Sequence, residues 1–158
     1  MCIRDSHKEG PEALADHNCV GACFLYRRKV YEAVGEYDPS MVLVEDYDYW
    51  LRVARRFPID HLRGIAPYKY RFHPGSLSST RETEVRIQIV RARCRHIDPT
   101  PSRRQALLGV YWPALWKFRI DGDLKAAWFC ARRCLSLAPW RLAYIRAAIG
   151  TGIRLSLI

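Results

Sequence analysis

The sequence lacks several patterns that would place it in a common class. It has no run of roughly 18 or more apolar residues, so no transmembrane helix is predicted. Its N-terminus lacks the apolar segment of a secretory signal peptide. Its six cysteines form no Cys-x-x-Cys pair, and none has a histidine at zinc-finger spacing. These absences favour buried, reduced thiols in a cytoplasmic protein.

Acidic residues are scarce in the second half of the chain. Residues 1–79 contain 11 Lys/Arg and 11 Asp/Glu, whereas residues 80–158 contain 15 Lys/Arg and only 5 Asp/Glu. The formal net charge of +10 therefore lies entirely in the second half. Such a basic region favours an anionic partner, such as a membrane surface, phosphates or nucleic acid. The alternative is a set of Arg-rich helices whose charges are simply solvated.

The remaining composition is typical of a globular protein. The chain has 158 residues, of which 49% are apolar and 27% charged, enough to bury a core. Residues 1–17 are predicted to form a leader and loop. The first six of them share no pattern with the neighbouring residues, and they are a candidate for a scar of sequence assembly.

The stretch 42–52 is the one around which the first half is organised. Apolar residues precede Glu45 and Asp46. A helical pattern follows these two acids and ends before Pro58. Asp46 is predicted to be the N-cap of this helix. Because a helix N-terminus stabilises an ionised carboxylate, Asp46 could also serve as a general base. A helix cap without catalytic role is the alternative.

Short strands and one further helix are predicted around this stretch. The apolar run at 20–26 predicts a buried strand, in which Gly21 indicates close approach of another backbone or of a ligand. Residues 27–34 predict a helix that ends at Gly35. Another short strand is predicted at 59–62.

A strand predicted at 67–73 has two different faces. Aromatic side chains alternate along it with cationic ones, which are Lys69, Arg71 and His73. A cationic face that leads into a Ser-rich loop suits an anionic ligand such as a pyrophosphate. A half-buried edge strand with a solvated basic face is the alternative.

The second half is predicted to be helical. Residues 82–97 fit both helical and strand periods, and the length of the segment favours a helix. A proline-containing linker at 99–101 precedes three further predicted helices, at 103–119, 123–138 and 140–156. Asp121-Gly122-Asp123 is predicted to form the turn between the first two of these three.

Four elements of residues 18–80 resemble, in order and spacing, the C-terminal half of the catalytic domain of family 2 glycosyltransferases, which have the GT-A fold. The elements are Gly21-Ala22-Cys23-Phe24-Leu25-Tyr26-Arg27-Arg28, Val34-Gly35-Glu36-Tyr37-Asp38, Glu45-Asp46-Tyr47-Asp48-Tyr49-Trp50-Leu51-Arg52 and Tyr70-Arg71-Phe72-His73-Pro74-Gly75-Ser76-Leu77-Ser78. The resemblance implies an α/β fold, with a partial GT-A mixed sheet and helices at 18–98 and an all-α basic tail at 99–158.

The resemblance also implies a reaction. It is inverting transfer of a sugar from a nucleotide-diphospho-sugar to a hydroxyl of a saccharide or lipid-linked acceptor, in cell-surface polysaccharide or glycolipid synthesis. The family's catalytic base maps to Asp46, with Glu45 as its neighbour. The positions implied to bind donor or acceptor are Gly21, Ala22, Arg71 and His73, and His73 also matches a position near the metal. Asp48 and Arg52 are expected to hold the helix in place.

One departure from the family pattern is large. The family carries an upstream Asp-x-Asp motif whose carboxylates hold Mg²⁺ or Mn²⁺ against the donor diphosphate. Only about twenty residues precede the Gly21 segment here, and they contain no such motif. Asp121-Gly122-Asp123 has the right letters but falls in a predicted helix–helix turn. The chain is therefore expected to be truncated at its N-terminus and not to transfer sugar by itself.

Three other functions compete with this one. A non-catalytic basic module that binds a membrane surface or a partner is supported by the charge asymmetry and by the tryptophans of the tail. Nucleic-acid binding is weaker, because no docking motif is present. Glycoside hydrolysis is disfavoured, because the adjacent Glu45 and Asp46 would not flank a sugar from opposite sides. In either favoured case the protein is expected to be cytoplasmic, peripheral on the inner membrane face.

Overall fold

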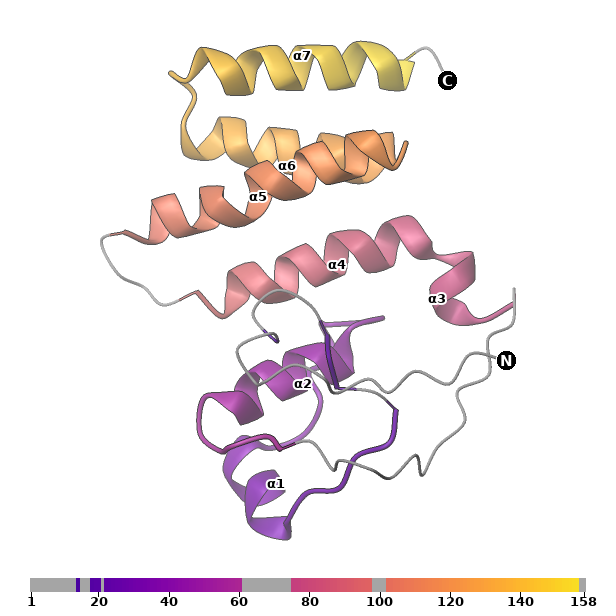
Figure 1. The fold of residues 1–158 in the computed structure, drawn as a ribbon, viewed down its shortest axis with the longest axis vertical. Helices are drawn as coiled ribbons and strands as arrows, with labels where there is room; N and C mark the ends of the chain where they lie inside the picture. The colour runs from indigo at the N-terminus through magenta and orange to yellow at the C-terminus, as the bar shows by residue number, and fades with distance from the viewer. Residues whose placement is uncertain (1–13, 15–17, 21, 61–74, 98–101, 157–158) are drawn as a thin grey trace. The chain divides into compact units, whose positions relative to one another are not determined.

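The computed structural model describes residues 14, 18–20, 22–60, 75–97 and 102–156 (Figure 1). The chain divides into two compact units, residues 1–82 and 83–158. The first unit holds the helices α1 (Arg28–Val34), α2 (Glu45–Ala54) and α3 (Leu77–Thr80), and the second α4 (Glu82–Arg95), α5 (Arg103–Ile120), α6 (Leu124–Leu137) and α7 (Leu142–Ser156). No helix in these ranges has the length and apolarity needed to cross a membrane.

The predicted α/β fold is wrong, because the described residues contain helices but no strand and no sheet. The segment predicted as a buried strand at 20–26 is the clearest case. Leu25 in its middle is 99% exposed, and no described segment pairs with it. Instead, Phe24 packs its ring against Trp50 of α2, with ring centroids 4.6 Å apart. Side-chain packing on a helix thus takes the place of a hydrogen-bonded ladder.

The other two predicted strands lie partly or wholly outside the described residues. Of the strand predicted at 59–62, the two described residues, Ile59 and Asp60, have no regular structure. The strand predicted at 67–73 lies outside the described residues.

The helices predicted from periodicity and from stop signals are confirmed. Gly35, with φ of 80°, ends α1 as predicted. Gly122, with φ of 79°, lies in the turn between α5 and α6, where a side chain would be strained. The helix predicted at 82–97 from the length of the segment is confirmed, since Glu82–Arg95 form α4. The predicted ends of the last three helices differ from the observed ones by at most two residues.

The predicted N-cap of α2 is wrong by two positions. The helix begins at Glu45, its N-cap is Val44, and no side chain caps it. The physical reason is the turn before it. The Val44 amide donates to the Met41 carbonyl at 3.0 Å, and the Asp48 amide donates to the Val44 carbonyl at 3.0 Å. This turn brings the chain into the helix early, so Asp46 lies inside the first turn.

A buried ion pair ties α2 to the C-terminal end of α1. Asp48 is fully buried, and Arg52 donates to its Oδ2 from Nε at 3.0 Å. The same guanidinium donates to the backbone carbonyls of Val34 and Glu36, each at 2.7 Å. Asp48 and Arg52 therefore hold the helix in place, as the sequence analysis expected.

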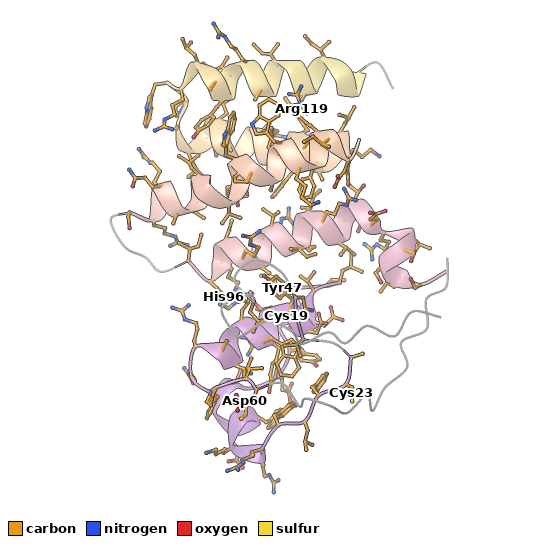
Figure 2. All side chains as sticks on the ribbon, in the orientation of Figure 1. Cys19, Cys23, Tyr47, Asp60, His96 and Arg119 are labelled. Atoms are coloured by element: carbon orange, nitrogen blue, oxygen red, sulfur yellow. The ribbon has the colours of Figure 1, made fainter. Side chains whose placement is uncertain are left out.

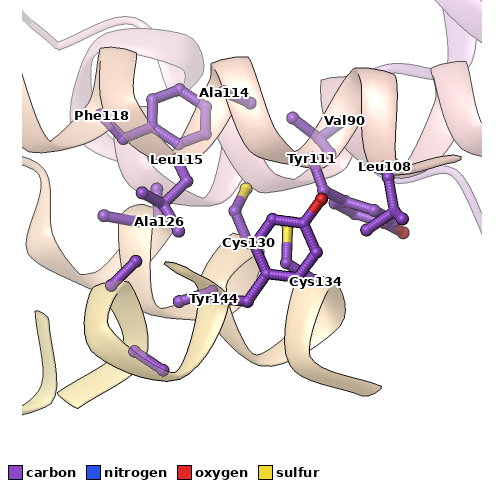
Figure 3. Packing of buried hydrophobic residues seen from close by; sticks show 14 of the residues in the cluster. Val90, Leu108, Tyr111, Ala114, Leu115, Phe118, Ala126, Cys130, Cys134 and Tyr144 are labelled. Carbon is purple, nitrogen blue, oxygen red and sulfur yellow. The ribbon is translucent and has the colours of Figure 1, made fainter. Parts of the chain in front are cut away.

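The second unit is a helical stack built on α6. Helix α5 packs on one side of α6 and α7 on another (Figure 1). Small side chains allow this close approach, since five of them on α6 are fully buried: Ala126, Ala127, Cys130, Ala131 and Cys134. Figure 3 shows Leu115, Tyr111 and Tyr144 packed around them. Dense packing of this kind makes the unit sensitive to any increase in side-chain volume on α6.

Polar side chains fasten the helices of this unit to one another. Arg119 of α5 donates to the Thr151 hydroxyl of α7 at 3.1 Å (Figure 2). Asp123 caps α6 by accepting from the Ala126 amide at 3.1 Å and also accepts from the Thr83 hydroxyl at 3.0 Å. These contacts give Asp123 of the Asp-Gly-Asp turn a structural role.

The described cysteines are free thiols, and most of them are buried. Burial raises the pKa of Cys130 to about 12 and of Cys134 to about 11, so both stay protonated and unreactive at neutral pH. The expectation of buried thiols does not hold for Cys23, which is exposed.

The ion pair of α2 gives a test of this fold. Asp48→Asn removes the buried charge and leaves the Arg52 guanidinium with carbonyl partners only. Removing one partner of a buried pair typically costs about 3–5 kcal/mol, and the 25% exposure of the Arg52 side chain lowers this to about 2 kcal/mol. Chemical denaturation of the purified chain measures the loss.

The matched control is Glu32→Gln, which breaks an exposed pair of the same spacing with Arg28 and should cost less than about 0.5 kcal/mol. Equal losses would contradict this role for Asp48.

Candidate functional site

The two predicted catalytic carboxylates are the first two residues of α2. Glu45 is exposed, whereas Asp46 is half-buried. Two amide groups hold the Asp46 carboxylate: the Asn18 side chain donates to Oδ2 at 3.1 Å, and the Tyr47 backbone amide donates to Oδ1 at 2.6 Å. In the described part of the chain, no lysine or arginine forms an ion pair with Asp46. The described residues thus orient the carboxylate without neutralising it.

The surroundings of Asp46 strengthen its affinity for a proton. Burial raises the pKa of this carboxyl above its usual range, and the negative charge of Glu45 raises it further. The hydrogen bonds from Tyr47 and Asn18 lower the pKa, but by less than burial raises it. A carboxylate of raised pKa is a better proton acceptor than an ordinary aspartate.

An aromatic surface adjoins the carboxylates. Phe24, Tyr26 and Tyr37 are each about two-fifths exposed. Their rings rest on two buried rings of α2: Phe24 lies on Trp50, with centroids 4.6 Å apart, and Tyr37 lies on Tyr49, with centroids 5.1 Å apart. Phe24 and Tyr26 stack nearly parallel, 6.1 Å apart. We call the rings of Phe24, Tyr26 and Tyr37 the aromatic surface.

Electrostatics link this aromatic surface to the carboxylates. Burial raises the pKa of Tyr37, and the nearby Tyr26, Asp46 and Glu45 raise it further. The Tyr37 hydroxyl therefore lies within the field of both carboxylates and stays protonated, as a hydrogen-bond donor, at neutral pH. Sequence analysis assigned these aromatic residues no role. The sequence pattern that could have identified Phe24 and Tyr26 is their alternation in Phe24-Leu25-Tyr26, which by itself is typical of a strand.

The buried polar atoms at this site that have no hydrogen-bond partner among the described residues include Asn18 Oδ1 and Trp50 Nε1. Asn18 also holds Asp46, and Trp50 lies under Phe24. An unpaired buried polar atom costs about 1–3 kcal/mol, so both atoms are suited to an additional partner.

Of the four residues predicted to bind donor or acceptor, the structure describes Ala22. Ala22 is exposed in a bend ahead of Phe24. Gly21, Arg71 and His73 lie outside the described residues, so their predicted roles stay predictions. The described ranges contain no group of three or more His, Cys, Asp or Glu side chains that could hold a metal ion. The described residues thus do not by themselves fit the Mg²⁺ or Mn²⁺ site that the resemblance implies.

Comparisons with known proteins add no relative. No model of a known protein family, no curated protein sequence and no solved structure matches the chain. The site must therefore be interpreted from its own residues.

The raised pKa of Asp46 predicts a pH-dependent loss of stability. An aspartate raised above its unfolded pKa of about 3.9 contributes stability below that pH, which is lost as pH rises through the folded pKa. Asp46→Asn cannot ionise, so it should gain stability relative to the unmodified chain between pH 4 and pH 7. Urea denaturation of both proteins at the two pH values measures the difference. Asp60→Asn, at an exposed carboxyl, is the control for removing one charge. A stability difference that is the same at both pH values would show that burial does not perturb Asp46.

Proposed function

We propose that the chain is part of an inverting glycosyltransferase in which Asp46 is the general base. The observation that carries the proposal is the setting of the Asp46 carboxylate. It is half-buried, oriented by two amide donors, free of a pairing cation in the described residues, and adjacent to exposed aromatic rings. Asp48, two residues further on, is by contrast paired with the Arg52 guanidinium.

The chemistry asked of Asp46 is one proton transfer. An acceptor hydroxyl donates a hydrogen bond to the carboxylate and attacks the anomeric carbon of the donor sugar from the face opposite the diphosphate. As the new carbon–oxygen bond forms, the proton passes to Asp46, and the bond to the nucleotide diphosphate breaks. The configuration at the anomeric carbon is inverted. The raised pKa favours the transfer, and Glu45 supports it by adding negative charge nearby.

The aromatic surface supports a saccharide as the acceptor. The apolar C–H face of a sugar ring can lie on exposed aromatic rings, and polar groups at the edge then fix its orientation. Here Phe24 and Tyr26 supply the stacked rings, and the protonated Tyr37 hydroxyl supplies a hydrogen-bond donor. Such a saccharide, free or lipid-linked, would present its hydroxyl to Asp46.

The donor side of the proposal depends on the resemblance alone. A nucleotide-diphospho-sugar is the implied donor, with Gly21, Ala22, Arg71 and His73 as implied contacts and Mg²⁺ or Mn²⁺ at its diphosphate. The metal would offset the charge of the leaving diphosphate, and the resemblance implies His73 as a residue near it. A cytoplasmic location at the inner membrane face, in cell-surface polysaccharide or glycolipid synthesis, completes the proposal.

Asp46→Asn tests the base directly, in whichever length of the gene product transfers sugar. Asparagine keeps the shape of the side chain but cannot accept the proton, so kcat should fall about 10²–10⁴-fold while donor affinity changes little. Glu45→Gln should have a smaller effect, because Glu45 tunes the base without replacing it. Transfer assays and donor titrations of the variants measure the two quantities. The control is Asp60→Asn, which should transfer normally.

Two outcomes would count against the proposal. Normal turnover by Asp46→Asn would return Glu45 and Asp46 to the role of an acidic helix start. Failure of every length of the gene product to transfer any sugar would remove the glycosyltransferase assignment itself.

A further inference from the structure

One face of α7 carries apolar side chains that are more than half exposed. Leu142, Ile149 and Ile153 are spaced by seven and four residues, so they share one side of the helix. They are 66%, 56% and 56% exposed. Ile145, which is half-buried, extends the row. We call these four residues the α7 stripe.

The contacts of α7 fix the direction in which the α7 stripe points. The opposite side of the helix is buried in its own unit through Tyr144, Ala147, Ala148 and Thr151. Arg119 of α5 fastens that side by donating to the Thr151 hydroxyl at 3.1 Å and to the Ala147 carbonyl at 3.4 Å. The Trp128 ring of α6 packs so closely on Gly152 that a Cβ there would lie 3.2 Å from it. The helix therefore cannot rotate to bury the stripe without losing these contacts.

Cations and a tryptophan accompany the α7 stripe. Arg146 is exposed and lies four residues after Leu142, within the stripe itself. Trp140, just before the helix, is 65% exposed, and the Arg104 guanidinium lies 5.3 Å from its ring centroid. From residue 124 to the C-terminus the sequence contains six Lys/Arg and no Asp or Glu. A partner for this surface must accept apolar side chains and positive charge together.

A second basic surface on α6 strengthens this conclusion. Lys125, Arg132 and Arg133 line an open groove of about 400 Å³ together with Trp128, Phe129 and Ser136. The Arg91 guanidinium of α4 lies 5.2 Å from the Phe129 ring centroid. Cations that lie over aromatic rings keep their charge exposed while their stems cover apolar area. The C-terminal unit thus presents aromatic and cationic groups on more than one helix.

We propose that the α7 stripe docks on an anionic lipid bilayer, with α7 lying in the plane of the interface. Leu142, Ile149 and Ile153 would enter the boundary between headgroups and acyl chains, and Trp140 would lie at the headgroup level. The Arg146 side chain would extend to the lipid phosphates. A second protein chain is disfavoured as the occupant, because it would place Arg146 in the middle of an apolar contact. This inference is independent of the proposed sugar transfer.

The test is vesicle co-sedimentation of the 158-residue chain. Vesicles of phosphatidylcholine with one quarter phosphatidylglycerol should bind the chain at low salt, and binding should weaken as salt increases. Vesicles of phosphatidylcholine alone should bind it far less. Ile149 is exposed in the free chain and would be buried in the bilayer. Ile149→Glu should therefore reduce partitioning at least tenfold, because it removes this apolar side chain and adds a negative charge. Arg146→Gln should reduce it about fivefold.

Matched controls separate this surface from general effects. Leu77→Glu changes an exposed leucine in α3, and Arg28→Gln removes an exposed arginine in α1. Both should bind like the unmodified chain, and circular dichroism should show all four variants folded. Equal binding to both kinds of vesicle, no binding at low salt, or unchanged binding by Ile149→Glu would overturn the proposal. So would self-association of the chain that Ile149→Glu abolishes, because the stripe would then be a protein–protein contact.

Discussion

The guanidinium of Arg52 is the contact on which the described geometry of the first unit depends. It joins the Asp48 carboxylate within α2 to the carbonyls of Val34, the last residue of α1, and of Glu36 just after it. Those carbonyls lie at and just after the end of a helix, where no intrahelical donor can reach them. One planar cation thus satisfies a buried anion and two orphan acceptors at once, which a lysine could not do with the same geometry.

This contact also explains why Asp46 can be held in place without an ion pair from the described residues. Because Arg52 fixes α2 against the end of α1, the position of Asp46 does not require an ion pair of its own. The same fixation holds Tyr49 and Trp50 as a base for the exposed rings of the aromatic surface. The aromatic surface and the carboxylate therefore share one rigid support, which is what a binding site on a small helical unit requires.

Local signals predicted the helices, whereas the strands and the details of the site depend on tertiary contacts. Gly35 and Gly122 stop helices through their own backbone conformation, with φ of 80° and 79°, so these helix ends were predictable. The run 20–26 has the composition of a buried strand, but a strand needs a partner, and Leu25 is almost fully exposed. Sequence spacing identified the carboxylates at the start of α2, yet it could not show that Asn18, 28 residues earlier, donates to Asp46. That contact depends on how the chain returns on itself, which no local pattern encodes.

Asp46 and Asp48 show how environment separates two identical side chains on one helix turn. Asp48 is fully buried and neutralised by Arg52, so its charge is committed to the fold. Asp46 is half-buried, receives only amide donors from the described residues, and has its pKa raised by burial. An ion-paired carboxylate would have to break its pair to take a proton, whereas one held by amides can accept a proton without moving a neighbour. One helix turn thus carries a carboxylate whose charge is committed to the fold and a second one to which we assign the proposed proton transfer.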